Sequence, residues 1–149
     1  MTVPCGEWVD LTKSLDHIGI AVSDTDAALR LYRDVLGLPV ETSEVVADQG
    51  VKATVLSLGD VHVELLEPTG PDTPVGRFLA SRGEGIHHLS IEVPDIRAAL
   101  GGARDAGVRL IDEEPRAGVG GKQIAFLHPK STGGVLIELS QKGTGANEQ

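Results

Sequence analysis

The chain has 149 residues, a length that fits one domain of ordinary size or two small modules fused into one core. Hydrophobic residues make up 40% of it but aromatic residues only 3%, so any core must be aliphatic. The formal net charge of −9 argues against a nucleic-acid partner, because no basic stripe exists to neutralise phosphates. Cys5 is the single cysteine, which excludes an intrachain disulfide and a thiolate metal cluster.

The sequence shows no sign of export or of a membrane span. The first residues lack the basic region and apolar run of a signal peptide, and no apolar run approaches membrane-spanning length. We therefore expect a soluble cytoplasmic protein with no membrane partner. Residues 1–14 are expected to be an N-terminal extension, and residues 142–149, which are Gly-rich and polar, a flexible tail.

The first half of the chain predicts a strand, a helix and three more strands. Alternating and β-branched residues at 15–22 indicate the first strand. Asp24 then stands where its carboxylate can accept free backbone N–H groups, and an amphipathic helix follows to about Leu36, where Gly37 ends it. The later strands of this half are expected at 40–46, 51–58 and 61–67.

The second half predicts the same order of elements. A linker at 68–85, rich in proline at its start, contains a helical turn at 75–81. A strand at 86–93 follows, and then a helix between Asp95 and Gly107. The remaining strands are expected at 108–113, 123–127 and 134–140.

These two halves are related by an internal repeat. When DHIGIAVSD is set against HHLSIEVPD, His17 falls on His88 and Asp24 falls on Asp95, each 71 residues later. The register continues along the helix and then slips by one residue, so that VLGLPV corresponds to AGVRLI. Chance rarely keeps apolar phase, an acidic helix start and a histidine in common over about twenty positions.

The repeat sets the fold class that we expect. The class is α+β, with two tandem βαβββ modules at 15–67 and 86–141 that form a curled mixed sheet around a metal-binding cleft. Because each module alone would leave one sheet face exposed, both are expected to belong to a single domain at 15–141.

Each module carries one histidine on its first strand and one glutamate on its last. Taken singly, a strand histidine is more often a hydrogen-bonded core residue, and a strand glutamate can simply point at solvent. The repeat favours a shared site instead, and two carboxylates brought together repel each other unless a cation lies between them. The expected metal ligands are His17, Glu64, His88 and Glu138.

Two nitrogen and two oxygen ligands without sulfur suit a six-coordinate divalent ion better than a closed structural zinc site. We therefore expect one divalent metal ion, with Co²⁺ favoured and Mn²⁺, Ni²⁺, Fe²⁺, Mg²⁺ or Zn²⁺ as alternatives. Only His88 is in register with His17, and the period of two directs His87 to the opposite face. His62 is in phase with Glu64 and is either a group that orients a ligand or a surface residue.

Several stretches resemble the methylmalonyl-CoA epimerase family of the vicinal oxygen chelate superfamily. They are LDHIGIAVSD, DQGV, VELLEP, GEGIHHLSIEV and GGKQIAFLHPKSTGGVLIEL, and the resemblance runs from about Leu15 to Gln141. It implies a homodimer, an acyl-CoA substrate and the same four metal ligands that the repeat indicates.

The resemblance also implies a reaction, the inversion of C2 in a 2-methylmalonyl-CoA-type thioester. The C2 proton is removed to give a metal-stabilised enolate and is returned on the other face, which requires two bases. Glu138 is the expected first base. Some members of the family carry the second base four residues after the glutamine of DQGV, but here that position is Ala53, so we expect Glu64 to serve instead.

A CoA thioester would need cations and polar groups to bind its phosphates and acyl part. Lys122 and Lys130, which lie close to glycines, are the expected substrate-binding cations, and Arg116 is a weaker candidate. His128 and Gln49 are further expected substrate contacts.

Other functions remain open at this point. A glyoxalase-like lyase or isomerase would act on a glutathione hemithioacetal, and an extradiol-type oxygenase would use iron but would not need Glu64 as a fourth ligand. A metal-free small-molecule-binding resistance protein of the same fold would have no reason to place two glutamates at matching positions. The substrate could also be a larger alkylmalonyl thioester.

Overall fold

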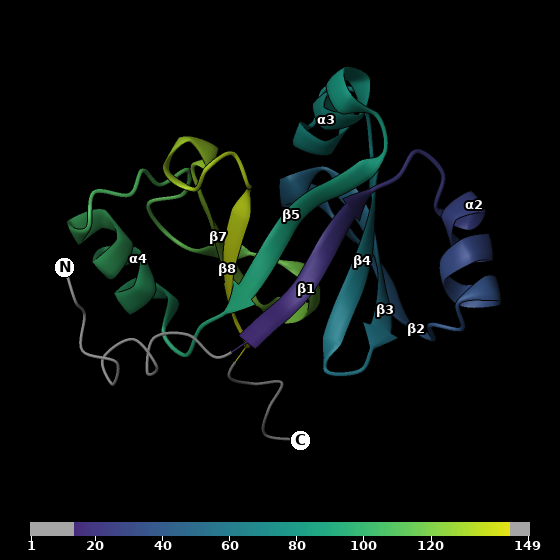
Figure 1. Cartoon of the computed structure of the whole chain (residues 1–149), viewed down its shortest axis with the longest axis horizontal. Helices are drawn as coiled ribbons and strands as arrows, with labels where there is room; N and C mark the ends of the chain where they lie inside the picture. The colour runs from purple at the N-terminus through teal and green to yellow at the C-terminus, as the bar shows by residue number, and fades with distance from the viewer. Residues whose placement is uncertain (1–13, 144–149) are drawn as a thin grey trace. The chain divides into compact units, whose positions relative to one another are not determined.

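The structure is a computed structural model that describes residues 14–143 in two compact units. The first unit is His17–His88, and the second contains residues 89–143 together with the first residues of β1 (Figure 1). The predicted N-terminal extension and tail fall largely on residues 1–13 and 144–149, which lie outside the described residues.

The first unit contains four strands that are ordered β2-β3-β4-β1. β1 runs parallel to β4, and the other neighbours are antiparallel. Its elements are β1 (Ser14–Ala21), α2 (Thr25–Leu29), the π-helix η1 (Arg30–Val35), β2 (Val40–Val46), the 3-10 helix η2 (Ala47–Gln49), β3 (Val51–Leu58), β4 (Val61–Pro68) and α3 (Pro74–Arg82).

The helix that follows β1 begins where the sequence predicts. The Asp24 carboxylate accepts hydrogen bonds from the backbone N–H groups of Asp26 and Ala27, which satisfies two of the free donors of the first turn. The expected single amphipathic helix is divided, however, because α2 continues directly into η1. There the N–H of Leu36 donates to the carbonyl of Leu31 at 2.8 Å, five residues back.

The core of the first unit lies between this helical segment and one face of the strands. Val22, Leu29, Leu56, Val63 and Leu65 form the buried cluster. Successive residues of a strand point to opposite faces, so the residues that alternate with these on β1 and β4 point away from the core. Each fully buried aliphatic side chain stabilises the fold by about 1.5–3 kcal/mol, so this face fixes the strand orientation.

The second unit repeats the pattern with strands ordered β5-β8-β7-β6. β5 is parallel to β8, whereas β8 with β7 and β7 with β6 are antiparallel. The elements are β5 (Gly85–Glu92), which begins in the first unit, α4 (Ile96–Asp105), β6 (Arg116–Ala117), η3 (Val119–Gly121), β7 (Gln123–Leu127), η4 (Pro129–Ser131) and β8 (Ile137–Gln141).

The second core matches the first. The buried cluster combines Val93, Ile96 and Leu100 with Ala125 and Leu139 of β7 and β8. Asp95 caps α4 by accepting the N–H of Ala98 at 3.1 Å, as its counterpart in the first unit caps α2. The predicted α+β class with two tandem βαβββ modules is therefore confirmed.

The predicted strand at 108–113 is wrong. Only Leu110 forms a bridge there, to Leu127, and the strand that pairs with β7 is the two-residue β6. The Asp112 carboxylate accepts the N–H of Phe126 at 2.8 Å and takes the place of a backbone carbonyl. Pro115 then has no N–H to donate, so a regular ladder cannot continue.

The last strand starts three residues later than the predicted 134–140. Gly133 and Gly134 have φ values of 73° and 92°, a left-handed conformation that turns the chain before Ile137 and that other residues rarely adopt. Within residues 14–143, no helix is both long and apolar enough to cross a membrane.

Candidate metal centre

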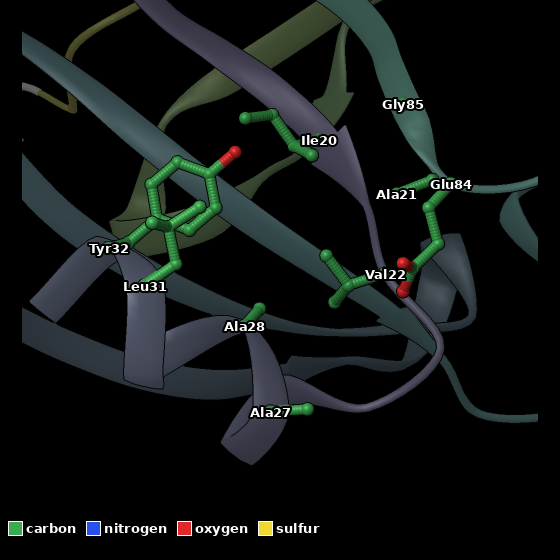
Figure 2. A pocket seen from close by; sticks show the side chains of 9 residues that line it. All are labelled: Ile20, Ala21, Val22, Ala27, Ala28, Leu31, Tyr32, Glu84 and Gly85. Carbon is green, nitrogen blue, oxygen red and sulfur yellow. The ribbon is translucent and has the colours of Figure 1, made fainter. Parts of the chain in front are cut away.

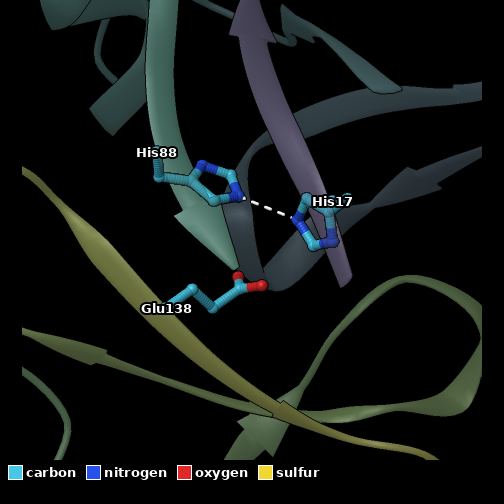
Figure 3. A group of neighbouring side chains, drawn as sticks. All are labelled: His17, His88 and Glu138. Carbon is cyan, nitrogen blue, oxygen red and sulfur yellow. Dashed lines mark hydrogen bonds between the residues drawn. The ribbon is translucent and has the colours of Figure 1, made fainter. Parts of the chain in front are cut away.

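Strand alternation places His17 on the face of β1 that points away from the first core. His88 lies midway along β5, and the side chains of His17 and His88 are both buried, with 3% and 4% of their surface exposed. Their Nε2 atoms lie 3.0 Å apart, and Figure 3 marks this contact with a dashed line. The rings meet edge to face, with centroids 5.1 Å apart. Two residues that are 71 positions apart are thus in direct contact.

Glu64 reaches the same face from the neighbouring strand. The parallel pairing of β1 with β4 sets His62 opposite His17 and Glu64 opposite Gly19. The Glu64 carboxylate is buried, and its Oε2 lies 3.2 Å from Nδ1 of His17. Glu64 and His88 therefore contact the two different nitrogens of one imidazole ring.

Gly19 makes room for the His88 ring. A Cβ atom added to Gly19 would lie 2.4 Å from Cε1 and 2.7 Å from Nδ1 of His88. No side chain fits at that distance, so the imidazole rests directly on the β1 backbone. The sequence analysis missed this role, although a glycine inside a strand does signal a close approach.

His87 contacts the other nitrogen of His88. Their Nδ1 atoms lie 2.9 Å apart, and the His87 ring also meets the edge of Phe78 with centroids 5.1 Å apart. Burial lowers the pKa of His87 to about 4, assisted by the charge of Arg82. Burial, together with the nearby His17 and His87, lowers the pKa of His88 well below its ordinary value. Both rings are neutral at neutral pH.

Glu138 occupies the matching position in the second unit. Its side chain projects from β8, as Figure 3 shows. It is buried, with 3% of its surface exposed. In the parallel pairing of β5 with β8 it stands opposite Ser90, two residues after His88. Glu64 likewise stands opposite the residue two positions after His17. The two glutamates therefore have the same strand register relative to their histidines.

The expected substrate cations differ in their surroundings. The Lys122 ammonium contacts the buried Asp16 carboxylate at 2.7 Å, an ion pair within the second unit. Lys130 is exposed on η4, where its backbone N–H donates to Nδ1 of His128 at 3.1 Å. Arg116 lies 3.3 Å from the Asp112 carboxylate.

The remaining expected residues lie in the first unit. Nε2 of His62 contacts the Glu41 carboxylate at 3.0 Å, to which the Ser57 hydroxyl also donates. Gln49 is partly exposed at the end of η2. Ala53 is fully buried opposite Glu44 and offers no group that transfers a proton.

A separate pocket of about 360 Å³ lies in the first unit (Figure 2). Ile20, Val22 and Tyr32 are among the residues that line it, so it opens on the helix side of β1. The Glu84 carboxylate at its edge accepts the N–H and the hydroxyl of Ser23 at 2.8 and 3.0 Å. No residue that lines this pocket belongs to the expected metal ligands.

The sequence profile of the Glyoxalase/Bleomycin resistance protein/Dioxygenase superfamily matches residues 16–126. The chain belongs to this superfamily.

Within the superfamily the chain is similar to proteins named methylmalonyl-CoA epimerase. The mitochondrial epimerase of Homo sapiens is 40% identical, over 85% of this chain and 73% of the human protein. The ethylmalonyl-CoA/methylmalonyl-CoA epimerase of Cereibacter sphaeroides is 41% identical, over 85% of this chain and 96% of that protein.

A solved structure gives the same result. A variant of Streptomyces coelicolor methylmalonyl-CoA epimerase in complex with 2-nitronate-propionyl-CoA is 43% identical and has a TM-score of 0.86. The match covers 90% of this chain and 96% of that one. The predicted resemblance and the predicted superfamily fold are both confirmed.

We predict that Gly19→Ala displaces the His88 ring. The new Cβ would overlap the imidazole, so the free energy of unfolding should fall by about 1–3 kcal/mol and the affinity for Co²⁺ by about tenfold or more. Urea unfolding and titration calorimetry measure the two effects. The control is Gly85→Ala on β5, where an added Cβ meets nothing within 4 Å. Unchanged Co²⁺ affinity in Gly19→Ala would contradict the packing role.

We also predict that acid destabilises the metal-free protein. The folded state holds His87 and His88 neutral, whereas the unfolded chain protonates them near pH 6.5, so stability is present above that pH and is lost below it. For His87, whose folded pKa is about 4, the loss should approach about 3 kcal/mol across this window. Urea unfolding from pH 7.5 to 4.5 measures it. A flat profile would contradict the prediction, and His87→Asn should make the slope shallower.

Proposed function

We propose that this enzyme inverts C2 of a 2-methylmalonyl-CoA-type thioester by removing and returning a proton. The observation that carries the proposal is the buried contact between His17 and His88, in a chain about 40% identical to several methylmalonyl-CoA epimerases. A contact between two imidazole nitrogens is a preformed pair of nitrogen donors, which suits a metal-assisted reaction.

The donor chemistry fits a divalent cation. His17 and His88 present facing Nε2 atoms at 3.0 Å, and the Glu64 carboxylate is buried beside His17. Neutral imidazoles and carboxylates are the ligands that Co²⁺, Mn²⁺, Ni²⁺, Fe²⁺ and Zn²⁺ accept. We propose that His17, Glu64, His88 and Glu138 hold the ion, with Co²⁺ favoured. The equal register of the two glutamates in their units supports this set.

The role of Glu64 depends on its contact with His17. Its carboxylate contacts Nδ1 of His17, whereas His88 contacts Nε2 of the same ring. The Glu64–His17 contact has an ion-pair distance without hydrogen-bond geometry, so it does not fix which nitrogen of the His17 ring carries the proton. A buried carboxylate oxygen of this kind would suit a bound cation, which supports Glu64 as a proposed ligand.

The proton chemistry is assigned to the two buried glutamates. Glu138 takes the proton from one face of C2, and Glu64 is the proposed donor on the opposite face, since Ala53 has no proton to give. Both carboxylates are 3% exposed or less, which keeps bulk water away from the transferred proton. A bound divalent cation supplies Lewis-acid stabilisation of the negative charge that develops on the thioester oxygen, a contribution of several kcal/mol.

The CoA part of the substrate is assigned to the expected polar residues. We propose that Lys130 contributes a phosphate contact, because it is exposed and cationic. Lys122 would have to exchange its Asp16 carboxylate for a phosphate. His128 and Gln49 complete the proposed set. The 2-nitronate-propionyl-CoA complex of the S. coelicolor enzyme supports an acyl-CoA ligand for this chain.

A second thioester substrate, with an ethyl group in place of the methyl group, is also a candidate. The C. sphaeroides relative is named for both ethylmalonyl-CoA and methylmalonyl-CoA, so we propose the methyl substrate first and the ethyl substrate second. The expected homodimer and cytoplasmic location stay predictions, as do the proposed domain boundaries.

Deuterium exchange tests the reaction directly. Incubation of 2-methylmalonyl-CoA with the protein in D₂O should place deuterium at C2, because the base exchanges its proton with solvent between turnovers. Mass spectrometry measures the incorporation, and chelator-treated protein with and without added Co²⁺ is the control. No protein-dependent exchange with either the methyl or the ethyl substrate would refute the function.

Variants of the two glutamates test which carboxylate acts on each face of C2. We expect Glu138→Gln and Glu64→Gln each to slow inversion by roughly 10²–10⁴-fold, the usual contribution of a positioned acid or base. Each variant should still exchange the epimer whose C2 proton faces its remaining carboxylate. Chiral analysis of the CoA ester alongside deuterium content distinguishes exchange from inversion.

The control for these variants is Glu84→Gln, which removes a carboxylate of the first unit that bonds Ser23. Elemental analysis of every variant shows whether the metal is retained. If Glu64→Gln keeps both its metal and full inversion, Glu64 is not the second base.

A further inference from the structure

A restrained arginine lies on the strand face of the second unit that also carries Glu138. On β7, Ala125 belongs to the buried apolar cluster, so its neighbour Phe126 points to the opposite face. Phe126 pairs with Glu138 of β8, and residues directly opposite each other in an antiparallel pair share a face. The guanidinium carbon of Arg116 lies over the Phe126 ring, 5.9 Å from its centroid. The charged end of Arg116 is therefore on the face of Glu138.

Asp112 restrains the same arginine. Its Oδ1 lies 3.3 Å from Nε of Arg116, and its Oδ2 accepts the backbone N–H of Phe126 at 2.8 Å. One carboxylate thus fixes the guanidinium relative to the strand that carries the ring beneath it. Because a guanidinium has several N–H donors in a rigid fork, a group that contacts one carboxylate through Nε can bind a second oxyanion at the same time.

The Arg116 side chain is restrained without being sealed from solvent. It is 33% exposed, whereas the Phe126 side chain beneath it is 7% exposed. A cation that rests on an aromatic ring has lost part of its water, and charges in such a partly desolvated place attract each other more strongly than in bulk water. In a chain with a formal net charge of −9, an anionic ligand depends on a few local cations of this kind.

The two lysines that are expected to bind the substrate have different surroundings. The Lys122 ammonium contacts the Asp16 carboxylate at 2.7 Å, and Lys130 is exposed on η4. A lysine is a compact charge on a flexible stem, whereas the planar fork of an arginine matches the two oxygens of a carboxylate or a phosphate. Among these cations, Arg116 is the one that aromatic and acidic neighbours already orient.

We propose that Arg116 is a substrate-binding residue whose guanidinium binds an oxyanion of the acyl-CoA thioester. A 2-methylmalonyl-CoA-type thioester offers the carboxylate on C2 and the phosphates of CoA, and an arginine fork binds either group. The inference rests on the proposed function, because it takes this thioester as the ligand. Arg116 transfers no proton, so its loss should weaken binding and raise KM while kcat changes little.

Two partial ligands distinguish the oxyanions. Propionyl-CoA keeps the phosphates but has no carboxylate on C2, whereas 2-methylmalonyl-pantetheine keeps the carboxylate but has no phosphate. Titration calorimetry of the Co²⁺-loaded protein measures the Kd of each. We expect Arg116→Met to weaken one of them by about 10–100-fold, the usual effect of losing hydrogen bonds to a charged group, and to leave the other within about twofold.

Each outcome of this titration decides the inference. A loss confined to propionyl-CoA assigns Arg116 to a phosphate, and a loss confined to the pantetheine ester assigns it to the carboxylate. Wild-type binding of both ligands by Arg116→Met would overturn the inference. A loss of the same size for both ligands would assign the effect to packing or net charge and would overturn it as well.

Arg97→Met is the matched control, because it removes the same charge from the second unit. Arg97 lies on α4 and contacts Glu114 at 3.0 Å, in an ion pair whose side chains are both more than half exposed. This variant should bind both ligands as the wild type does. If it loses as much affinity as Arg116→Met, the effect belongs to net charge and the proposed contact is refuted.

Arg116→Lys gives a second variant that keeps the charge but not the fork. We expect it to recover part of the affinity that Arg116→Met loses and to bind the affected ligand several-fold more weakly than the wild type does. Urea unfolding shows whether each variant is folded, since both changes disturb the contact with Asp112. If Arg116→Met does not fold, wild-type binding of both ligands by folded Arg116→Lys would overturn the inference.

The failure of this inference can be told apart from the failure of the proposed function. A wild-type protein that binds both ligands but places no deuterium at C2 of 2-methylmalonyl-CoA refutes the reaction, while calorimetry still decides the role of Arg116. A wild-type protein that binds neither ligand refutes the acyl-CoA substrate and the role of Arg116 together.

Discussion

The contact between the buried imidazoles of His17 and His88 constrains the residues around it in the first unit. Two rings can approach to 3.0 Å across neighbouring backbone only if one of them rests on a residue without a side chain, and Gly19 is that residue. The two facing Nε2 atoms can share a hydrogen bond only while one of them lacks a proton, and burial lowers the pKa of His88, which keeps that ring neutral. The apolar cluster on the other face of β1 fixes the strand that carries His17.

Much of this architecture can be predicted from the sequence because of the repeat. Matching histidines and glutamates indicate equivalent strands, and the structure gives both glutamates the same register, Glu64 opposite Gly19 and Glu138 opposite Ser90. Periodicity also predicts the faces correctly, since alternation alone decides which residues meet the helices. The ligand set itself stays a prediction, because register shows equivalence and not coordination.

Other features depend on contacts that a pattern does not contain. Period two assigns His87 and His88 to opposite faces, yet the Nδ1 atoms of these adjacent rings lie 2.9 Å apart. The segment around Asp112 has the composition of a strand, yet its carboxylate replaces a backbone acceptor and ends the ladder. In both cases a side chain bonds a group that the pattern assigns elsewhere. Hydrophobic periodicity does not predict hydrogen bonds that a single polar side chain makes.

The π-helix η1 coincides with a one-residue difference in length between the two modules. Gly37 stands thirteen positions after the capping Asp24, whereas Gly107 stands only twelve after Asp95, so the two modules differ by one residue. A hydrogen bond from residue i to i+5 encloses one residue more than an α-helical bond, and the bond between Leu31 and Leu36 at η1 is of this kind. The π-helical turn thus accommodates the extra residue of the first module between β1 and β2.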